Sequence, residues 1–125
     1  MAKKPFKLPF TQHVVHTQEV QEELITITSK NSQDDFAEII KDLDDFGTDM
    51  DFHRSKKQIK PLGEGWWELR VKQGGLYWRI LFRKISRKKH PAEYGLIYMF
   101  RKKTNKINKK EWDKATKIAK REGWL

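Results

Sequence analysis

The fold of this 125-residue chain is decided by residues 62–104, which contain LGEGWWELRV (62–71), YWRILF (77–82) and LIYMFRKKT (96–104). Apolar and polar residues alternate in each of these three stretches, which is typical of a β-strand with one face in a core. Gln73-Gly74-Gly75 supplies turn residues between the first two stretches. We therefore expect an antiparallel hairpin followed by a third strand.

The alternation also predicts which side chains share a face of the sheet, because residues two apart on a strand point the same way. The apolar face carries Trp67, Leu69, Val71, Trp78, Ile80 and Phe82. The opposite face, here called the polar face, carries Glu68, Arg70, Tyr77 and Arg79, with Trp66 beside them. We expect the apolar face to lie in the core and the polar face to be exposed.

The third strand is assigned to the two faces by the same rule. Tyr98, Phe100 and Lys102 share one face, and Ile97, Met99 and Arg101 share the other. If Ile97 and Met99 belong to the core, Tyr98 and Lys102 join the polar face.

Charge is divided unevenly along the chain, whose formal net charge is +10. Residues 1–53 hold 5 Lys/Arg and 11 Asp/Glu, a net of −6, whereas residues 54–125 hold 22 and 6, a net of +16. A strong positive field over one part of a protein favours a polyanionic partner such as nucleic acid or the ribosome. A lysine-rich surface that only confers solubility is the plainer interpretation.

Composition narrows the class of protein further. The length predicts one domain over residues 1–125, with residues 1–8 flexible. The chain contains no cysteine, which excludes disulfides and thiolate metal sites and fits a reducing compartment.

His13 and His16 point to opposite faces if they lie on a strand, so we expect no metal and no cofactor. No apolar run reaches transmembrane length, and we expect a cytoplasmic protein without membrane contact.

Helices are predicted on both sides of these strands in the sequence. A weak alternating pattern over 9–16 indicates a first strand. Residues 19–28 are predicted to form a short helix, although the β-branched residues at 25–28 disfavour helical structure. A clearer helix spans 32–46, beginning at Ser32 and stopping at Gly47. Its acidic residues are expected on the outer surface: Asp34, Asp35, Glu38, Asp42, Asp44 and Asp45.

The C-terminal part of the chain is predicted to contain a connector, a loop and a last helix. Residues 49–60 are predicted to be a polar connector, and 83–90 a basic loop whose Lys88 and Lys89 either grip phosphates or only aid solubility. Asn108 is expected to cap a last helix whose apolar side is Trp112, Ala115, Ile118 and Ala119.

The order of these motifs resembles the HigB-like, phage-derived branch of the RelE/ParE toxin superfamily. The resemblance covers roughly 36–119 and rests on GEGWWELR, on the aromatic-Arg strand and on the Phe-x-Lys-Lys-Thr segment. It implies an α+β fold in the order β-α-α-β-β-β-α, with a small curved antiparallel sheet packed on helices. It also implies the toxin of a type II toxin–antitoxin system, a ribosome-dependent and metal-independent mRNA endoribonuclease that inhibits translation. Its partners would be the ribosome, mRNA and a cognate antitoxin, a small helix-turn-helix protein.

Site residues are carried over from this resemblance position by position. Arg79 would clamp the scissile phosphate with Arg70 beside it, because arginine stays charged and its fork matches phosphate oxygens. Tyr98 stands where relatives often have histidine, so Tyr98 or Lys102 would act as acid or base; Glu68 is either the base or the partner of Arg70. Further RNA contacts are expected from Trp66, Tyr77, Arg101, Lys103, Lys88 and Lys89. Trp66 either stacks on a base or covers a core edge.

Two other functions fit the same residues. A ParE-like protein would inhibit DNA gyrase through the sheet surface and need no acid or base. A noncatalytic nucleic-acid-binding module would bind in a salt-sensitive manner and show no turnover.

Overall fold

The computed structural model describes residues 11–48, 58–73, 76–85, 93–102 and 106–125. The predicted flexible segment 1–8 and Lys88, Lys89 and Lys103 lie outside these ranges. The elements in chain order are β1 (Val14–His16), α1 (Gln18–Leu24), α2 (Lys30–Phe46), β2 (Ile59–Gly63), β3 (Trp66–Gln73), β4 (Leu76–Lys84), β5 (Tyr94–Lys102) and α3 (Lys109–Glu122).

The five strands form one sheet in the order β1-β5-β4-β3-β2. Strands β2 to β5 pair antiparallel, while β1 pairs parallel with β5. The predicted hairpin is confirmed, since Gln73 opposes Leu76 and the pairing continues to Trp66 opposite Arg83. The fold is mixed α+β, as predicted, but it has five strands where the predicted order β-α-α-β-β-β-α has four.

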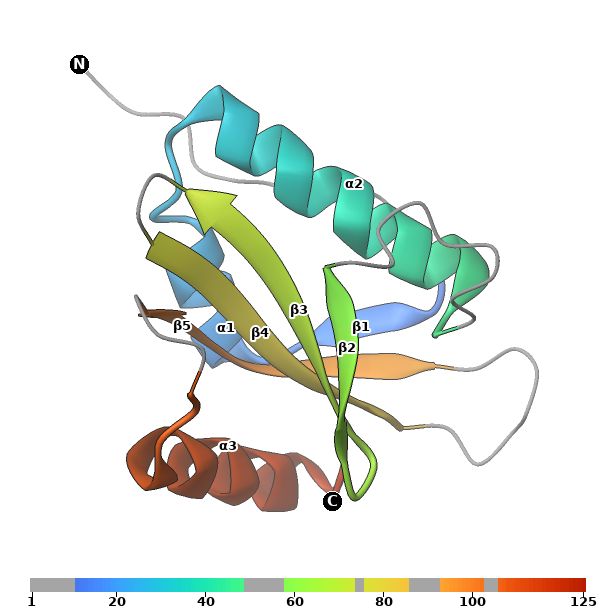
Figure 1. The fold of residues 1–125 in the computed structure, drawn as a ribbon. Helices are drawn as coiled ribbons and strands as arrows, with labels where there is room; N and C mark the ends of the chain where they lie inside the picture. Colours follow the sequence, from blue (N-terminus) through green and yellow to red (C-terminus); the bar gives the residue numbers. More distant parts are fainter. Residues whose placement is uncertain (1–10, 49–57, 74–75, 86–92, 103–105) are drawn as a thin grey trace.

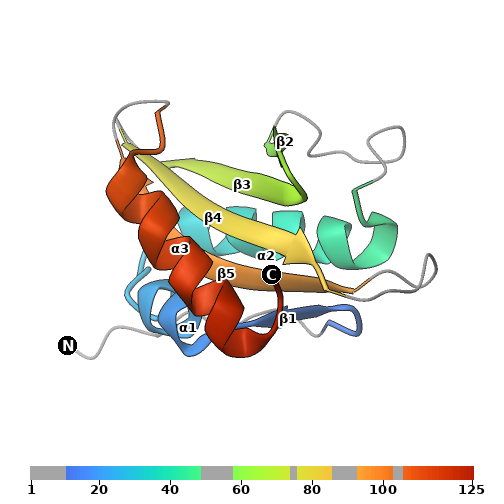
Figure 2. The same ribbon diagram turned by 90° about the horizontal axis from the view of Figure 1, so that it is seen from below.

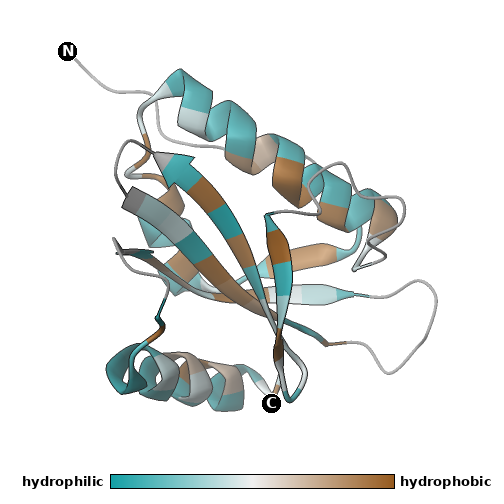
Figure 3. Cartoon of the chain, viewed as in Figure 1, coloured by the Kyte–Doolittle hydropathy of each residue, from teal (hydrophilic) through white to brown (hydrophobic). Residues whose placement is uncertain are grey.

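Helices cover both faces of this sheet. Figure 1 shows α2 along one face and α3 along the other, and Figure 2 shows α3 crossing β4 and β5 with α2 behind the sheet. The main core lies on the α2 side and contains residues of α1, α2 and the apolar face of the sheet. The alternation of hydropathy that predicted this face is visible along β3 in Figure 3. The predicted sides of β3 and β4 are thereby confirmed for Leu69, Val71, Trp78, Ile80 and Phe82.

A second core lies on the other face, between the sheet and α3. Its buried members are Trp66, Leu81, Ile97, Phe100, Ala115, Ile118 and Ala119. The predicted apolar side of the last helix therefore packs onto the face of the sheet that was expected to be open.

The helix ends follow the expected capping chemistry, with one shift. Asn108 accepts a hydrogen bond from Glu111 N at 3.0 Å, which confirms the start of α3. Gly47 ends α2 with a φ of 61°. However, α2 begins two residues earlier than predicted, because Ser29 rather than Ser32 is its N-cap. Helix α1 ends at Leu24, so the β-branched run after it is not helical.

Strand β2 is not among the elements predicted from the sequence. It occupies the end of the predicted connector and continues to Gly63, and Glu64 and Gly65 then turn the chain into β3 with φ values of 55° and 85°. Both turn residues have positive φ, as in a two-residue type I′ hairpin loop. The pattern was weak because β2 contains Pro61 and a register shift between Pro61 and Gly63.

The predicted parity of β5 fails at one residue. Tyr98 opposes Leu81 and Leu96 opposes Phe82, so Ile97 has no partner in this register and forms an irregularity of the bulge type. Ile97 consequently belongs to the core under α3, whereas Met99 belongs to the main core.

Two of the acidic residues of α2 are not on the outer surface. Asp42 and Asp44 are 1% and 7% exposed. The carboxylate of Asp44 accepts hydrogen bonds from the backbone N–H groups of Gln12 and His13, at 2.9 and 2.6 Å. Asp44 therefore ties the segment before β1 to α2.

Candidate functional site

The β3–β4 hairpin brings the polar residues together on one face of the sheet. Arg70 lies directly opposite Arg79 in the register, and Glu68 lies opposite Leu81, one pleat further along β3. Two like charges face each other in this arrangement, which is unfavourable unless an anion lies between them.

Glu68 provides that anion. Arg70 Nε donates a hydrogen bond to Glu68 Oε1, and Arg79 Nη1 lies 3.5 Å from Glu68 Oε2. One carboxylate is thus shared by two guanidinium groups. Of the two alternatives for Glu68, the structure shows pairing with Arg70.

The expectation that this polar face is exposed is wrong for Glu68 and Arg79. The side chains of both residues are 0% exposed. The physical reason is that α3 is amphipathic and must bury its apolar side, and its small residues Ala115 and Ala119 allow it to approach the sheet closely. Arg79 is consequently out of reach of a substrate in this conformation.

Burial changes the electrostatics of Arg79. Desolvation lowers the pKa of its guanidinium, the negative charge of Glu68 opposes that shift, and the positive charge of Arg70 adds to it. Glu111 on α3 also acts to raise this pKa. Glu111 lies in the first turn of α3, and no local sequence pattern shows that it is near Arg79.

Arg70 is the member of this group that reaches solvent. Its side chain is 18% exposed, and its guanidinium carbon lies 5.9 Å from the centroid of the Tyr77 ring. Tyr77 is half-buried. Arg70 and Tyr77 are therefore placed together, as the strand parity predicts, at the accessible end of the buried ion-pair cluster.

The residues of β5 divide between the two faces. Tyr98 is half-buried, packs against the core under α3 and stacks on Phe100 with ring centroids 5.5 Å apart. Lys102 lies opposite Tyr77 in the register, on the strand predicted to complete the site. Arg101 is exposed and covers Trp78, at 5.2 Å from its ring centroid. Because Trp78 belongs to the main core, Arg101 is separated from Arg70 by the sheet.

Trp66 covers a core edge and is not available as a base-stacking platform. It is 7% exposed and meets Trp112 of α3 edge-on, with ring centroids 5.5 Å apart and planes at 78°. Arg83 lies over it at 5.1 Å from the ring centroid. Arg83 was expected in a loop but belongs to β4, and it donates to the backbone oxygens of Glu64 and Trp124 at 2.9 and 3.1 Å.

The described residues contain no cluster of three or more His, Cys, Asp or Glu side chains that could hold a metal ion. None of the helices they form is both long enough and apolar enough to cross a bilayer.

The fold and site define a small mixed α+β domain in which a helix closes one face of the sheet over a carboxylate held by two arginines. Residues 23–120 match the family described as "Phage derived protein Gp49-like (DUF891)". The match covers more than half of the chain, which therefore belongs to this family of phage-derived, RelE/toxin-like proteins. Neither the curated proteins nor the solved structures contain a match to the chain.

Proposed function

We propose that this chain is the toxin of a type II toxin–antitoxin pair of the HigB-like branch, acting as a ribosome-dependent, metal-independent mRNA endoribonuclease. Membership of a toxin-like family supports a toxin-like module, and the residues described above support the finer assignment. The observation that carries it is Arg70, a guanidinium held by a buried carboxylate and still 18% exposed on the sheet.

The proposed reaction is attack of a ribose 2′-hydroxyl on the adjacent phosphorus. The bond to the 5′-oxygen of the next nucleotide breaks, leaving a 2′,3′-cyclic phosphate and a 5′-hydroxyl. Negative charge develops on the phosphate oxygens during this step, and a preorganised cation stabilises it. Arg70 is the group proposed to make that contact, because arginine keeps its charge and presents a rigid donor fork.

Glu68 and Arg79 then have a positioning role. A carboxylate that is fully buried between two guanidiniums has no access to a 2′-hydroxyl, so Glu68 is not the base in this proposal. Glu68 instead fixes the orientation of Arg70, and Arg79 balances the charge of Glu68. Acid and base are assigned to the tyrosine beside Arg70, Tyr77, and to Tyr98 or Lys102 on the neighbouring strand.

The test is expression of the chain with and without Arg70→Ala, followed by mapping of RNA ends in a translating extract. The wild type is expected to arrest growth and to cut mRNA in register with codons, and Arg70→Ala to abolish both. The variant is expected to remain folded because Arg79 still balances the buried charge of Glu68. Lys60→Ala is the matched control, since it also removes one exposed positive charge, on β2. A folded Arg70→Ala protein with full cleavage would remove the site assignment.

The burial of Glu68 and Arg79 favours a second candidate, a noncatalytic nucleic-acid-binding module or a ParE-like gyrase inhibitor. Two of the five groups expected to act in catalysis are covered by α3. Intact mRNA together with DNA damage identifies gyrase inhibition. RNA binding without any cut identifies the noncatalytic module.

A further inference from the structure

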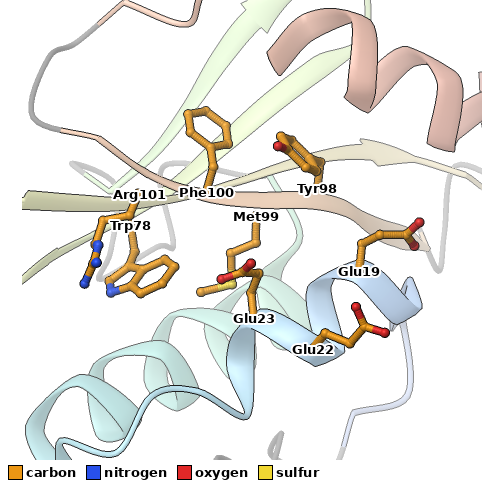
Figure 4. A pocket seen from close by; sticks show the side chains of 8 residues that line it. All are labelled: Glu19, Glu22, Glu23, Trp78, Tyr98, Met99, Phe100 and Arg101. Carbon is orange, nitrogen blue, oxygen red and sulfur yellow. The ribbon is translucent and has the colours of Figure 1, made fainter. Parts of the chain in front are cut away.

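A groove of about 400 Å³ runs between α1 and the second half of β5 (Figure 4). We call it the α1–β5 groove. Its lining residues are Glu19, Glu22, Glu23, Trp78, Tyr98, Met99, Phe100 and Arg101. Two of these residues, Tyr98 and Arg101, are also candidate site residues, but the groove as a whole has no role in the functions considered above.

The groove exists because β1 is short. It pairs with β5 only at Tyr94, Gly95 and Leu96. Thr17 then closes the junction, with its backbone N–H donating to Leu96 O at 3.0 Å and its hydroxyl to Ile97 O at 2.8 Å. Beyond Ile97 the neighbour of β5 on this side is α1, and a helix beside a strand leaves space that a second strand would fill.

The two walls of the groove differ in chemistry. The wall formed by α1 presents three carboxylates within five residues, Glu19, Glu22 and Glu23 (Figure 4). The opposite wall contains the buried side chains of Met99 and Trp78, with the exposed Arg101 guanidinium over the Trp78 ring, whereas the Phe100 ring points to the α3 side of β5 (Figure 4). This combination suits a ligand with an apolar stem and a cationic head.

The three carboxylates of the groove differ in their hydrogen-bond and ion-pair partners. Glu19 binds Arg121 of α3 through two hydrogen bonds of 2.6 and 2.8 Å, which lower the pKa of its carboxyl. Glu22 accepts a hydrogen bond from the Gln18 amide at 3.1 Å. Within the part of the chain that the structure describes, the half-buried Glu23 carboxylate makes no hydrogen bond or ion pair. Glu23 therefore adds a negative charge to the groove, and Arg101 is a cation on its opposite wall.

We propose that the α1–β5 groove docks arginine side chains from an extended basic segment of a partner protein. The aliphatic stem lies on Met99, and the guanidinium meets Glu22 and Glu23 on the wall formed by α1. Nucleic acid is disfavoured at this place because its phosphates would face three carboxylates. The toxin-like family suggests an antitoxin as this partner. The charge of the groove then predicts that the antitoxin binds it through a basic segment.

The docking proposal is independent of RNA cleavage. The groove lies against α1, whereas Arg70 lies on β3. Peptide binding is measured without RNA, so its failure and a failure to cleave RNA are separate results.

The probe is a short synthetic peptide in which arginine alternates with valine, titrated into the full chain by calorimetry at low salt. A peptide with glutamine in place of arginine is the uncharged control. The wild type is expected to bind the arginine peptide and not the glutamine peptide. No binding of the arginine peptide, or binding of both, would overturn the proposal.

The variant that tests the place of binding is Glu22→Gln combined with Glu23→Gln, which leaves the Glu19–Arg121 pair intact. Affinity is expected to fall roughly tenfold, or about 1.4 kcal/mol, for two partly screened ion pairs. The matched control is Asp35→Asn with Glu38→Gln, which removes the same charge from exposed positions of α2. Equal weakening in both variants means that the peptide follows net charge, and the groove assignment is then wrong.

Discussion

At the residue scale, the feature that matters most is a charged cluster without access to water. Glu68 and Arg79 are both 0% exposed, and removing two charges from water costs several kcal/mol each unless they compensate one another. The contacts of Glu68 with Arg70 and Arg79 supply that compensation. A cluster of this kind is far more sensitive to loss of one member than an ion pair on the surface.

We expect Glu68→Gln to destabilise the protein by about 3–5 kcal/mol, because it leaves the buried Arg79 charge uncompensated. Urea unfolding followed by circular dichroism measures the loss. Glu38→Gln, at an exposed position of α2, is the control and should change stability by less than about 0.5 kcal/mol.

The double variant Glu68→Met with Arg79→Met tests whether charge compensation is the cause of this loss of stability. Removing both fully buried members leaves only the charge of Arg70, which reaches solvent, so much of the lost stability should return. A double variant as unstable as the sum of its single variants would show that the cluster is not held by charge compensation. For the same reason Arg79→Ala, which the sequence alone suggests as a test of catalysis, would report mainly on folding.

At the scale of elements, the position of α3 decides what the sheet can present. Its C-terminal end is fixed by a close approach: a Cβ added at Gly95 of β5 would lie 2.6 Å from the ring of Trp124 and 3.0 Å from a methyl group of Ile85. Glycine is therefore needed at this point so that the residue after the helix can pack on the strand.

Gly95→Ala is expected to cost about 1–3 kcal/mol, since the Trp124 ring must move to make room for the methyl group. In a Trp124→Ala background the same substitution should cost much less, and the two measurements form a double-mutant cycle. Additive effects would contradict the assigned contact.

The pair between Glu19 and Arg121 links α1 to α3 and predicts a dependence of stability on pH. Hydrogen bonding to Arg121 lowers the pKa of Glu19 in the folded protein from its ordinary 4.5. A lowered folded pKa means that the stabilisation is present above pH 4.5 and is lost as the pH falls through the folded value.

Glu19→Gln should therefore be slightly less stable than the wild type at neutral pH, with the difference disappearing in acid. The effect is small because half of the Arg121 side chain is exposed, and salt should reduce it further. Thermal unfolding of both proteins across this pH range is the measurement. A difference that persists in strong acid would show that the ion pair is not its cause.

At the scale of the whole molecule, charge is divided between two sides. The acidic first half of the chain forms α1 and α2 on one face of the sheet, and the lysine-rich α3 covers the other. A polyanion should therefore approach from the α3 side, which is also the side of Arg70.

We expect the logarithm of the binding constant for single-stranded RNA to fall linearly with the logarithm of salt concentration, with a slope of roughly −0.7 for each phosphate contacted. Lys114→Gln with Lys117→Gln, both exposed on α3, should make this slope shallower. Lys30→Gln with Lys41→Gln on α2 is the matched control and should leave it unchanged. The same change in both variants would show that RNA responds to net charge and not to one side of the molecule.

Much of the fold was predictable from the sequence because its signals are local. Alternation within β3 and β4 depends only on the two-residue period of a strand, so the grouping of Glu68, Arg70, Tyr77 and Arg79 on one face was correct. The cap at Asn108 depends equally on neighbouring residues. The prediction failed where the local signal was interrupted. The proline in β2 concealed that strand, and the bulge at Ile97 placed this residue on the face opposite Met99.

The sequence by itself determined which side chains share a face, and the tertiary structure decided which face meets water. Both faces of this sheet carry large apolar residues, so either could have been covered. Burying the apolar side of α3 against Trp66 and Phe100 also encloses Glu68 and Arg79, because all four lie on the same side of the strands. That choice depends on contacts between residues far apart in the chain, and no pattern within a single strand records it.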